Sequence, residues 1–385
     1  MTISSCWFAV PLFTAAIGAQ AEHLVGPGGF PTIQAAVDAA SDGDIVRIAP
    51  GSYDGFGAQA KSLTFVRDQP NAATPVTIVS GVDLTQTAEN RCVLAGLEFR
   101  APNAVGISVF VAHGSVVIEN CVFDLAGLVL NGSRAVLRDC DIAGKGTAIS
   151  LSGADLMAND CRLVGLVGKP LFTAVGAVTA QDSTLQLARC ELRGAPGSDP
   201  VFRLPTAALA IGGWTAPARV WLVDCTLIGG ANATMAEPAI EGGNALVRTH
   251  RSVLQHGGGP ALPAIEFPLT EQPGPLLTLD VEPALLTIGG NVSLDLRGEP
   301  ADLLAMLGSF ELSAPLPLPA LEQPAYGAGE WAVLGFAIGD GTGAATFPLA
   351  APNAPTLRGL VVYLRGIDLA RLPLQASPVA GLVVQ

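Results

Sequence analysis

A short alternating pattern of apolar residues recurs through the middle of the chain, and each copy contains one cysteine. Apolar residues lie five and three positions before the cysteine and two positions after it, as at Val116, Ile118 and Phe123 around Cys121. This alternation has the period of two that is typical of a strand, and it loses phase just before the cysteine. The cysteines of the five copies are Cys121, Cys140, Cys161, Cys190 and Cys225. The pattern predicts a repeat protein built from short strands.

A polar or charged residue stands immediately before each of these cysteines, where the alternation loses phase. These residues are Asn120, Asp139, Asp160, Arg189 and Asp224. Asn and Asp tolerate the left-handed backbone conformation that a sharp bend requires, so this position is expected to form a corner between strands. The spacings between successive cysteines are 19, 21, 29 and 35 residues, so the outer loops differ in length while the repeated core stays the same. Short parallel strands joined by such corners form a parallel β-helix, in which equivalent residues stack about 4.8 Å apart.

The repeated cysteines are expected to form a structural column inside this coil. The chain has seven cysteines, of which Cys6 lies in an N-terminal apolar segment and Cys92 lies outside the five copies. Stacked inward cysteines behave as small buried apolar groups, which favours free thiols. Neighbouring rungs are also within disulfide reach, so bridges between them are the alternative.

The residue after each repeated cysteine is expected to point outward. These residues are Val122, Asp141, Arg162, Glu191 and Thr226. The charges of Asp141, Arg162 and Glu191 alternate in sign, and opposite charges on neighbouring strands stabilise a sheet by about 0.2–1 kcal/mol per pair. The pattern favours a surface charge ladder, with a row of substrate-binding residues as the alternative.

Residues 1–21 have the features of a secretory signal peptide. An apolar stretch runs from Cys6 to Ile17 and is followed by Ala-Gln-Ala at 19–21, although no Lys or Arg precedes it. The mature chain is therefore expected to begin at or near Glu22 and to be secreted or held in the cell envelope. No later run of about eighteen apolar residues is present, so no transmembrane segment is expected.

Residues 28–53, GGFPTIQAAVDAASDGDIVRIAPGSY, predict a helix followed by a strand at 45–48. Pro31 and Thr32 open the helix, and its apolar positions fall on one face. This segment resembles the entry segment of the pectin-lyase-like superfamily of right-handed parallel β-helices. The resemblance extends to about residue 258 and implies an all-β, right-handed parallel β-helix over residues 22–258, with the N-terminal helix capping the open end of the coil.

The motifs of catalytic members of this superfamily are not matched. Polygalacturonases carry a Gly-His-Gly and an Arg-x-Lys motif and pectinesterases an Asp-Phe-Ile-Phe-Gly motif, and the sequence contains none of these. Residues 220–224, Val-Trp-Leu-Val-Asp, resemble a pectate lyase phrase, but a cysteine stands where that phrase has histidine. Asp224 is therefore the one catalytic candidate, and a plain copy of the chain's own repeat is the favoured interpretation.

Metal chemistry has little support in the sequence. Clustered carboxylates at Asp139, Asp141 and Asp160 would suit calcium only if their oxygens met at one point, and Asp141 is expected to face Arg162 instead. His250 stands roughly where another cysteine of the repeat is expected, but no cysteine or carboxylate lies at zinc-like spacing from it. No metal site and no cofactor are predicted, with calcium as the alternative.

The overall charge excludes some classes of partner. The formal net charge is −13, from 20 basic and 33 acidic residues. Nucleic acid and anionic membrane surfaces would repel such a chain, and polygalacturonate would do so unless cations bridged the two.

The character of the sequence changes after the last repeat. Residues 259–275 are rich in Gly and Pro and are expected to form a linker. Residues 276–385 then show short alternating runs separated by turns, which predict a small all-β, sandwich-like module with one helix-like run at 301–307.

Two functions are compatible with these features. The first is a non-catalytic exported scaffold whose long face binds a polysaccharide or another cell-surface component. The second is a divergent polysaccharide lyase or hydrolase that acts on an acidic glycan. The missing motifs favour the first.

Overall fold

The computed structural model describes residues 20–69, 73–102, 106–166, 176–197, 204–215, 217–260, 262–265, 277–282, 286–310, 312, 315–316, 325–326, 331–370, 372 and 374–385. Residues 1–19, which include most of the predicted signal peptide, and most of the predicted linker lie outside this set. The chain divides into two compact units, Ala21–Gln272 and Pro273–Gln385.

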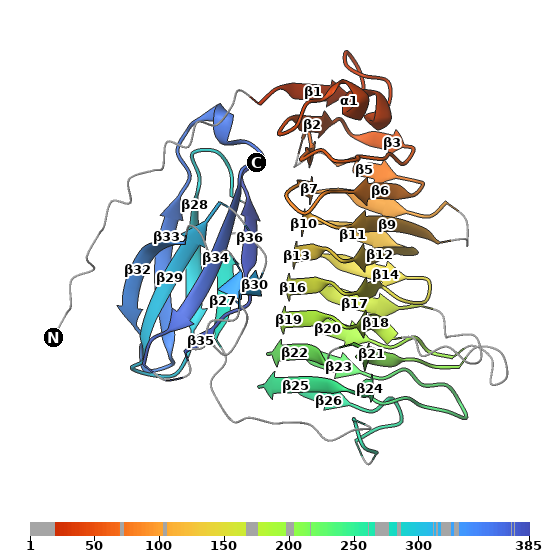
Figure 1. Ribbon diagram of the computed structural model, residues 1–385, viewed down its shortest axis with the longest axis vertical. Helices are drawn as coiled ribbons and strands as arrows, with labels where there is room; N and C mark the ends of the chain where they lie inside the picture. The colour runs from red at the N-terminus through yellow and green to blue at the C-terminus, as the bar shows by residue number, and fades with distance from the viewer. Residues whose placement is uncertain are drawn as a thin grey trace. The chain divides into compact units, whose positions relative to one another are not determined.

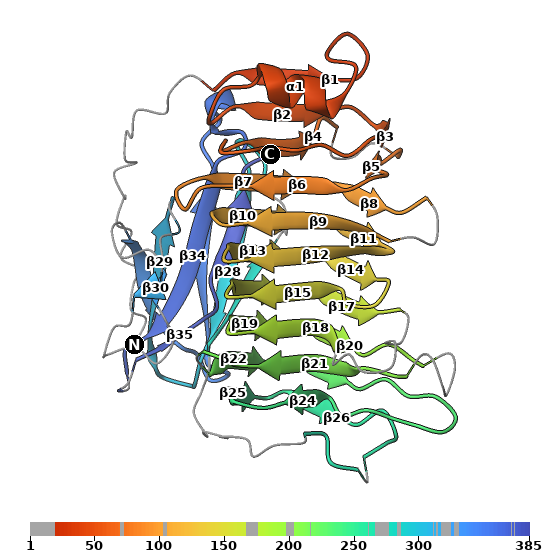
Figure 2. The ribbon, with the colours of Figure 1, turned by 45° about the vertical axis from the view of Figure 1, so that its right-hand side comes forward.

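The first unit is a parallel β-helix whose described strands form three parallel sheets, A, B and C, of ten, nine and seven strands. Sheet A consists of β1 (Glu22–Val25), β2 (Ile45–Ile48), β4 (Thr64–Arg67), β7 (Arg91–Ala95), β10 (Ser115–Glu119), β13 (Arg134–Arg138), β16 (Asp155–Asn159), β19 (Thr184–Ala188), β22 (Ala218–Val223) and β25 (Ala245–His250). Sheet B consists of β3 (Gly51–Tyr53), β5 (Val76–Ile78), β8 (Glu98–Arg100), β11 (Val122–Asp124), β14 (Asp141–Gly144), β17 (Arg162–Gly165), β20 (Glu191–Arg193), β23 (Thr226–Ile228) and β26 (Val253–Gln255). Sheet C consists of β6 (Val82–Thr85), β9 (Ile107–Ala112), β12 (Ala126–Asn131), β15 (Ile149–Ser152), β18 (Gly176–Gln181), β21 (Ala207–Gly212) and β24 (Ile240–Gly242). Figures 1 and 2 show these strands stacked rung upon rung from β1 to β26.

The inward positions of successive rungs stack in register and form one continuous core. Ile118 lies beside Leu94 and Leu137, and all three are buried. On sheet B, the rings of Phe99 and Phe123 stack with centroids 4.6 Å apart. The predicted parallel β-helix is confirmed, because the alternating apolar residues of the repeat are the ones that fill the coil.

The phase break before each cysteine is the corner between sheet A and sheet B. The residues at this position have left-handed backbone conformations, with φ from +50° at Asn120 to +56° at Asp160. Arg189 adopts the same conformation, at +52°, although long side chains rarely occupy it. The break in the hydrophobic pattern therefore marks a change of strand direction within each rung.

The N-terminal helix α1 (Ile33–Ala39) lies against the first strands of the coil (Figure 2). The hydroxyl of Thr32 caps it by accepting a hydrogen bond from the amide of Ala35 at 3.1 Å. Ile33, Ala36 and Val37 are buried in the same core as the strands that follow. The helix therefore covers apolar residues at the start of the coil, as the sequence predicted.

The second unit contains two antiparallel sheets that share one hydrophobic core. One consists of β27 (Thr278–Glu282), β28 (Asn291–Arg297) and β33 (Ala344–Ala350), and the other of β29 (Leu303–Ser309), β32 (Ala332–Ile338), β34 (Val361–Asp368), β35 (Gln375–Ala376) and β36 (Ala380–Val383). A short pair, β30 (Pro315–Leu316) and β31 (Ala325–Tyr326), and a 3₁₀ turn, η1 (Pro355–Leu357), complete the described elements. Leu294 from one sheet and Leu364 from the other are buried in the common core, as in a sandwich.

The helix-like run at 301–307 was a wrong prediction, because residues 303–309 form strand β29. This strand pairs with β32 on one side and with β34 on the other. Its apolar residues have good helix propensity, but the backbone hydrogen bonds of two neighbouring strands override that preference.

No helix among the described residues is long and apolar enough to cross a membrane.

Candidate functional site

The five repeated cysteines occupy equivalent positions in successive rungs, immediately before strands β11, β14, β17, β20 and β23 of sheet B. The carbonyl of Cys121 accepts a hydrogen bond from the amide of Asp141 at 3.0 Å, and the carbonyl of Cys161 accepts one from the amide of Glu191 at 2.9 Å. The same link recurs at Cys140, Cys190 and Cys225. All five thiols are buried and free. The corner and the cysteine together thus form a repeated turn that passes the chain from sheet A to sheet B.

Burial in the coil makes three of these thiols poor nucleophiles. Burial raises the pKa of Cys121, Cys161 and Cys225 well above the usual range. Thiols donate to backbone carbonyls, as from Cys140 Sγ to the carbonyl oxygens of Arg138 at 3.2 Å and Ile118 at 3.4 Å. Because the thiolate is the reactive form, Cys121, Cys161 and Cys225 act as packing groups rather than nucleophiles.

Cys92 lies outside this column, on strand β7 of sheet A, where it pairs with Val116. Burial raises its pKa to about 11. The side-chain amide of Gln86 donates to its sulfur at 3.3 Å. It therefore fills an inward position of a strand, unlike the five cysteines that follow the corner.

The cysteine position in the last rung is taken by Ser252. The carbonyl of Cys225 accepts a hydrogen bond from the amide of Val253, and the hydroxyl of Ser252 accepts one from the amide of Cys225 at 3.1 Å. Arg251 occupies the corner with φ of +48°. His250, which the spacing had placed near this position, instead ends strand β25 and pairs with Val223. The spacing between cysteines gave the wrong residue because the rungs differ in length. Aligning Arg-Ser-Val-Leu at 251–254 with the earlier copies of the repeat identifies Ser252 as the equivalent of cysteine.

The corner residues themselves form charge pairs between successive rungs. Arg189 donates through Nε and Nη2 to both carboxylate oxygens of Asp160, at 2.6 and 2.5 Å. Arg251 forms the same fork with Asp224, at 2.7 and 2.8 Å. Asp139 differs, because its Oδ2 lies 3.4 Å from Nη1 of Arg138, the preceding residue on the same rung. The bidentate geometry explains why arginine occupies a left-handed corner, since the ion pair offsets the strain of that backbone conformation.

The environment of Asp224 keeps this carboxyl ionised. Burial by itself would raise its pKa, but the hydrogen bonds and charge of Arg251, together with the charges of His250 and Arg189, lower the pKa below its ordinary value of 3.8. A carboxylate held in this way is a poor general acid at neutral pH, because it releases its proton too readily.

The outward row of sheet B contains one of the predicted charge pairs. Arg162 Nη1 lies 3.0 Å from Oδ1 of Asp141 on the preceding rung. Glu191, on the next rung, forms an ion pair with Arg193 of its own strand. The outward row therefore contains one ion pair between neighbouring strands, Asp141–Arg162, and one within a strand, Glu191–Arg193.

The three aspartates considered for calcium are divided between two positions of the coil. Asp139 and Asp160 are corner residues, whereas Asp141 begins β14 and points outward beside Arg162. Each of the three has an arginine within 4 Å. Within the described ranges, no group of three or more His, Cys, Asp or Glu side chains is arranged to hold a metal ion.

The outward face of sheet C differs in character from that of sheet B. Over the five rungs from β9 to β21, two register columns of this face contain only uncharged residues. One column is Phe110, Val129, Ser150, Thr179 and Ala210, and the other is Ala112, Asn131, Ser152, Gln181 and Gly212. Asp83 and Glu241 stand on the rungs at the two ends. We call these two columns the sheet C face.

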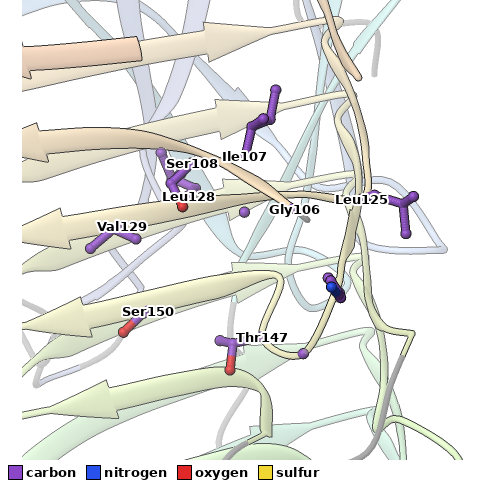
Figure 3. Close-up of a pocket in the computed structure, with 11 residues that line it drawn as sticks. Gly106, Ile107, Ser108, Leu125, Leu128, Val129, Thr147 and Ser150 are labelled. Atoms are coloured by element: carbon purple, nitrogen blue, oxygen red, sulfur yellow. The ribbon is translucent and has the colours of Figure 1, made fainter. Parts of the chain in front are cut away.

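A shallow concavity of about 230 Å³ lies at one side of the sheet C face (Figure 3). It is lined by Ser108, Gly127, Val129 and Ser150 on the strands and by residues 145–147 of the turn between β14 and β15. The turn contributes the ammonium group of Lys145 and the hydroxyl of Thr147. Sites that enclose a drug-sized ligand have volumes of about 300–1,000 Å³, so this hollow suits part of an extended ligand.

The sheet C face was missed in the sequence because the cysteine-centred repeat does not extend to it. A second signal was present upstream of the cysteines: apolar pairs such as Val109 and Val111, or Leu128 and Leu130, alternate ahead of each copy. These pairs are buried on sheet C, and most of the residues between and beside them are partly or fully exposed.

A scan against protein-family models and a search of curated proteins found no match to this chain.

Proposed function

We propose that the coil is a non-catalytic scaffold that binds a neutral polysaccharide along the sheet C face, on a secreted or cell-envelope protein. The observation that carries this proposal is the five-rung stretch of uncharged side chains on that face, in a chain whose net charge is −13. Neutral sugars are recognised by hydroxyl and amide hydrogen bonds and by apolar contacts, and this face offers both.

The chemistry of the face supports an extended ligand. Asn131, Ser152 and Gln181 lie in one column on successive rungs, about 4.8 Å apart, so their polar groups form a regular series. Asn131 and Ser152 are exposed and Gln181 is half-buried. A linear glycan laid along the coil axis would meet one polar side chain of this column at each of these three rungs.

The carboxylates support binding rather than cleavage. Glycan hydrolysis requires an acid and a base that converge on one bond. Asp160 and Asp224 are instead held in arginine forks at separate corners, and Asp141 pairs with Arg162.

We also propose that the coil belongs to the pectin-lyase-like superfamily and is exported. The resemblance of residues 28–53 to the entry segment of that superfamily supports the first part. The second is compatible with strand β1, which begins at Glu22, the first residue expected after signal cleavage.

A polysaccharide panel, scored for both binding and cleavage with and without calcium, tests the function. Cellulose, xylan, mannan, chitin, pectate and alginate serve as probes. We expect binding to at least one neutral polymer, independent of calcium and without cleavage products. Binding to none of them, or to pectate and alginate alone, would contradict the proposal.

Matched variants then locate the binding surface. A double Asn131→Ala and Gln181→Ala variant removes amides from the sheet C face and should weaken binding. A double Val122→Ala and Thr226→Ala variant changes the outward row of sheet B and should leave binding unchanged. Equal effects of the two variants would argue against the sheet C face.

The enzymatic alternative has its own test. If the purified protein cleaves pectate, alginate or a related acidic polymer, and Asp224→Ala abolishes cleavage without lowering the melting temperature, the chain is a divergent lyase or hydrolase.

A further inference from the structure

Trp214 is an unusually exposed aromatic side chain for its size. It lies in the turn between β21 and β22, and 84% of its surface is accessible to solvent. Most large aromatic side chains of soluble proteins lie largely buried, because exposing an indole ring to water forgoes the gain from burial. The exposure of this indole is therefore typical of a residue that binds a ligand or partner.

The backbone that carries Trp214 is fixed by the rungs on either side. Oδ1 of Asp182, on the preceding rung, accepts hydrogen bonds from the amides of Trp214 at 2.7 Å and Thr215 at 3.0 Å. On the following rung, Nδ2 of Asn244 donates to the carbonyl of Gly213 at 2.7 Å. Asp182 and Asn244 have left-handed backbone conformations, with φ of +48° and +51°, between their strands of sheet C and sheet A. The turn is thus anchored to the coil, so an indole at its tip loses little freedom on binding a ligand.

The turn begins directly after Gly212, the residue that occupies the column of Asn131, Ser152 and Gln181 on β21. Gly212 pairs with Gln181, which pairs with Ser152, and Trp214 follows Gly212 by two residues. A ligand that follows Asn131, Ser152 and Gln181 down the coil therefore approaches this turn. Trp214 is two rungs from β15, which is about 10 Å along the coil axis.

We infer that Trp214 is a stacking platform for one sugar ring of a neutral glycan bound on the sheet C face. This inference rests on the proposed function and names the residue that would recognise a sugar ring at the β21 end of the sheet C face. A pyranose ring presents an apolar face of C–H groups and a rim of hydroxyls. The indole would pack against the apolar face while hydroxyls and amides of the sheet C face meet the rim. A stacked nucleic acid base is disfavoured as occupant by the net charge of −13.

Isothermal titration with defined hexasaccharides tests the inference. The probes are cellohexaose, xylohexaose, mannohexaose and chitohexaose. For the hexasaccharide that binds the wild-type protein most tightly, we expect Trp214→Ala to weaken binding by more than about tenfold. Trp214→Tyr should recover most of the affinity, since a smaller aromatic ring still stacks.

The matched control is Phe336→Ala, which removes another exposed aromatic ring, 58% accessible, on strand β32 of the second unit. It should leave affinity unchanged, and the melting temperatures of all variants should match that of the wild-type protein. Because Trp214 is on the surface, its loss is not expected to impair folding.

The outcomes separate the two proposals. If the wild-type protein binds a hexasaccharide and Trp214→Ala binds it equally well, the stacking platform is wrong and the proposed function stands. If the wild-type protein binds neither the hexasaccharides nor the neutral polymers, the proposed function fails and the platform fails with it. Equal losses in Trp214→Ala and Phe336→Ala would also overturn the inference, because they would indicate general apolar adhesion.

Discussion

Arg251 donates to both carboxylate oxygens of Asp224 from the equivalent corner of the next rung, at 2.7 and 2.8 Å. Asp160 and Arg189 repeat the arrangement at earlier rungs of the coil. The corner column is therefore held together by side chains as well as by backbone hydrogen bonds. This ion pair gives Asp224 a structural role at its corner.

We expect the Asp224–Arg251 pair to contribute measurably to stability. In a double-mutant cycle with Asp224→Asn and Arg251→Asn, both replacements tolerate the left-handed corner, so the cycle isolates the ion pair from backbone strain. The coupling should be about 1 kcal/mol, because the fork is bidentate and only partly screened by solvent. Chemical denaturation measures it.

The Asp141–Arg162 pair on the outer row is the control for this cycle. Its side chains are about half exposed, and both of its hydrogen bonds come from one nitrogen, Nη1 of Arg162, so its coupling should be below about 0.5 kcal/mol. Equal coupling free energies at the two sites would show that the bidentate geometry at the corner does not strengthen the ion pair.

The stability conferred by Asp224 should depend on pH in a defined direction. The pKa of this carboxyl is lowered on folding. Its contribution is therefore fully present above the unfolded-state pKa and is lost as the pH falls through the lower folded-state pKa. The difference in unfolding free energy between the wild-type protein and Asp224→Asn should be present above about pH 5 and should shrink below about pH 4. Denaturation midpoints from pH 7 to pH 2 check it, and a difference that grew as the pH fell below about 4 would contradict the assigned ion pair.

A charge placed in the cysteine column should unfold the coil locally. Cys161 is buried between Cys140 and Cys190, so Cys161→Asp would bury an unpaired carboxylate and should cost several kcal/mol, on the order of 3–5. Thr226→Asp, in the outward row, should change stability by less than about 0.5 kcal/mol. Thermal melting compares the two, and an unchanged melting temperature for Cys161→Asp would refute the buried column.

The thiols should be free but inaccessible in the folded protein. The six described cysteines are buried, and Cys92, with a pKa of about 11, shows how burial suppresses the thiolate. In the folded mature protein at pH 8, Ellman's reagent should label these six thiols only slowly. After unfolding in guanidinium chloride, it should label all six. Fewer than six thiols after unfolding without reductant would indicate disulfides between rungs.

The secreted protein should begin at or near Glu22. The apolar stretch and the Ala-Gln-Ala site of residues 19–21 are the basis for this prediction. N-terminal sequencing of the protein from the culture medium or the cell envelope decides it. Recovery of an intact Met1 from the cytosol would show that residues 1–21 are not a signal peptide.

Part of the candidate site could be predicted from the sequence and part could not. The alternating residues around Cys121 and the aspartates before the cysteines predicted the coil and its corners, because period and turn chemistry are local properties. The partners of the corner residues were not predicted. Asp224 meets Arg251 from 27 residues later only because one rung of the coil has that length here. The sheet C face was missed for a related reason, since its residues become one surface only when rungs of unequal length are stacked.

The sequence by itself determined that this protein is a stack of short strands with a buried column of small residues, because inward positions must be apolar at every rung wherever the chain turns. Only the tertiary structure decided which residue completes the column. Ser252 fills the position that spacing assigned near His250, since the corner at Arg251 sets the register. Tertiary pairing likewise made a strand of residues 303–309, whose local preference is helical. Hydrophobic period is encoded locally, whereas register, charge pairing and the composition of a surface depend on which rungs become neighbours.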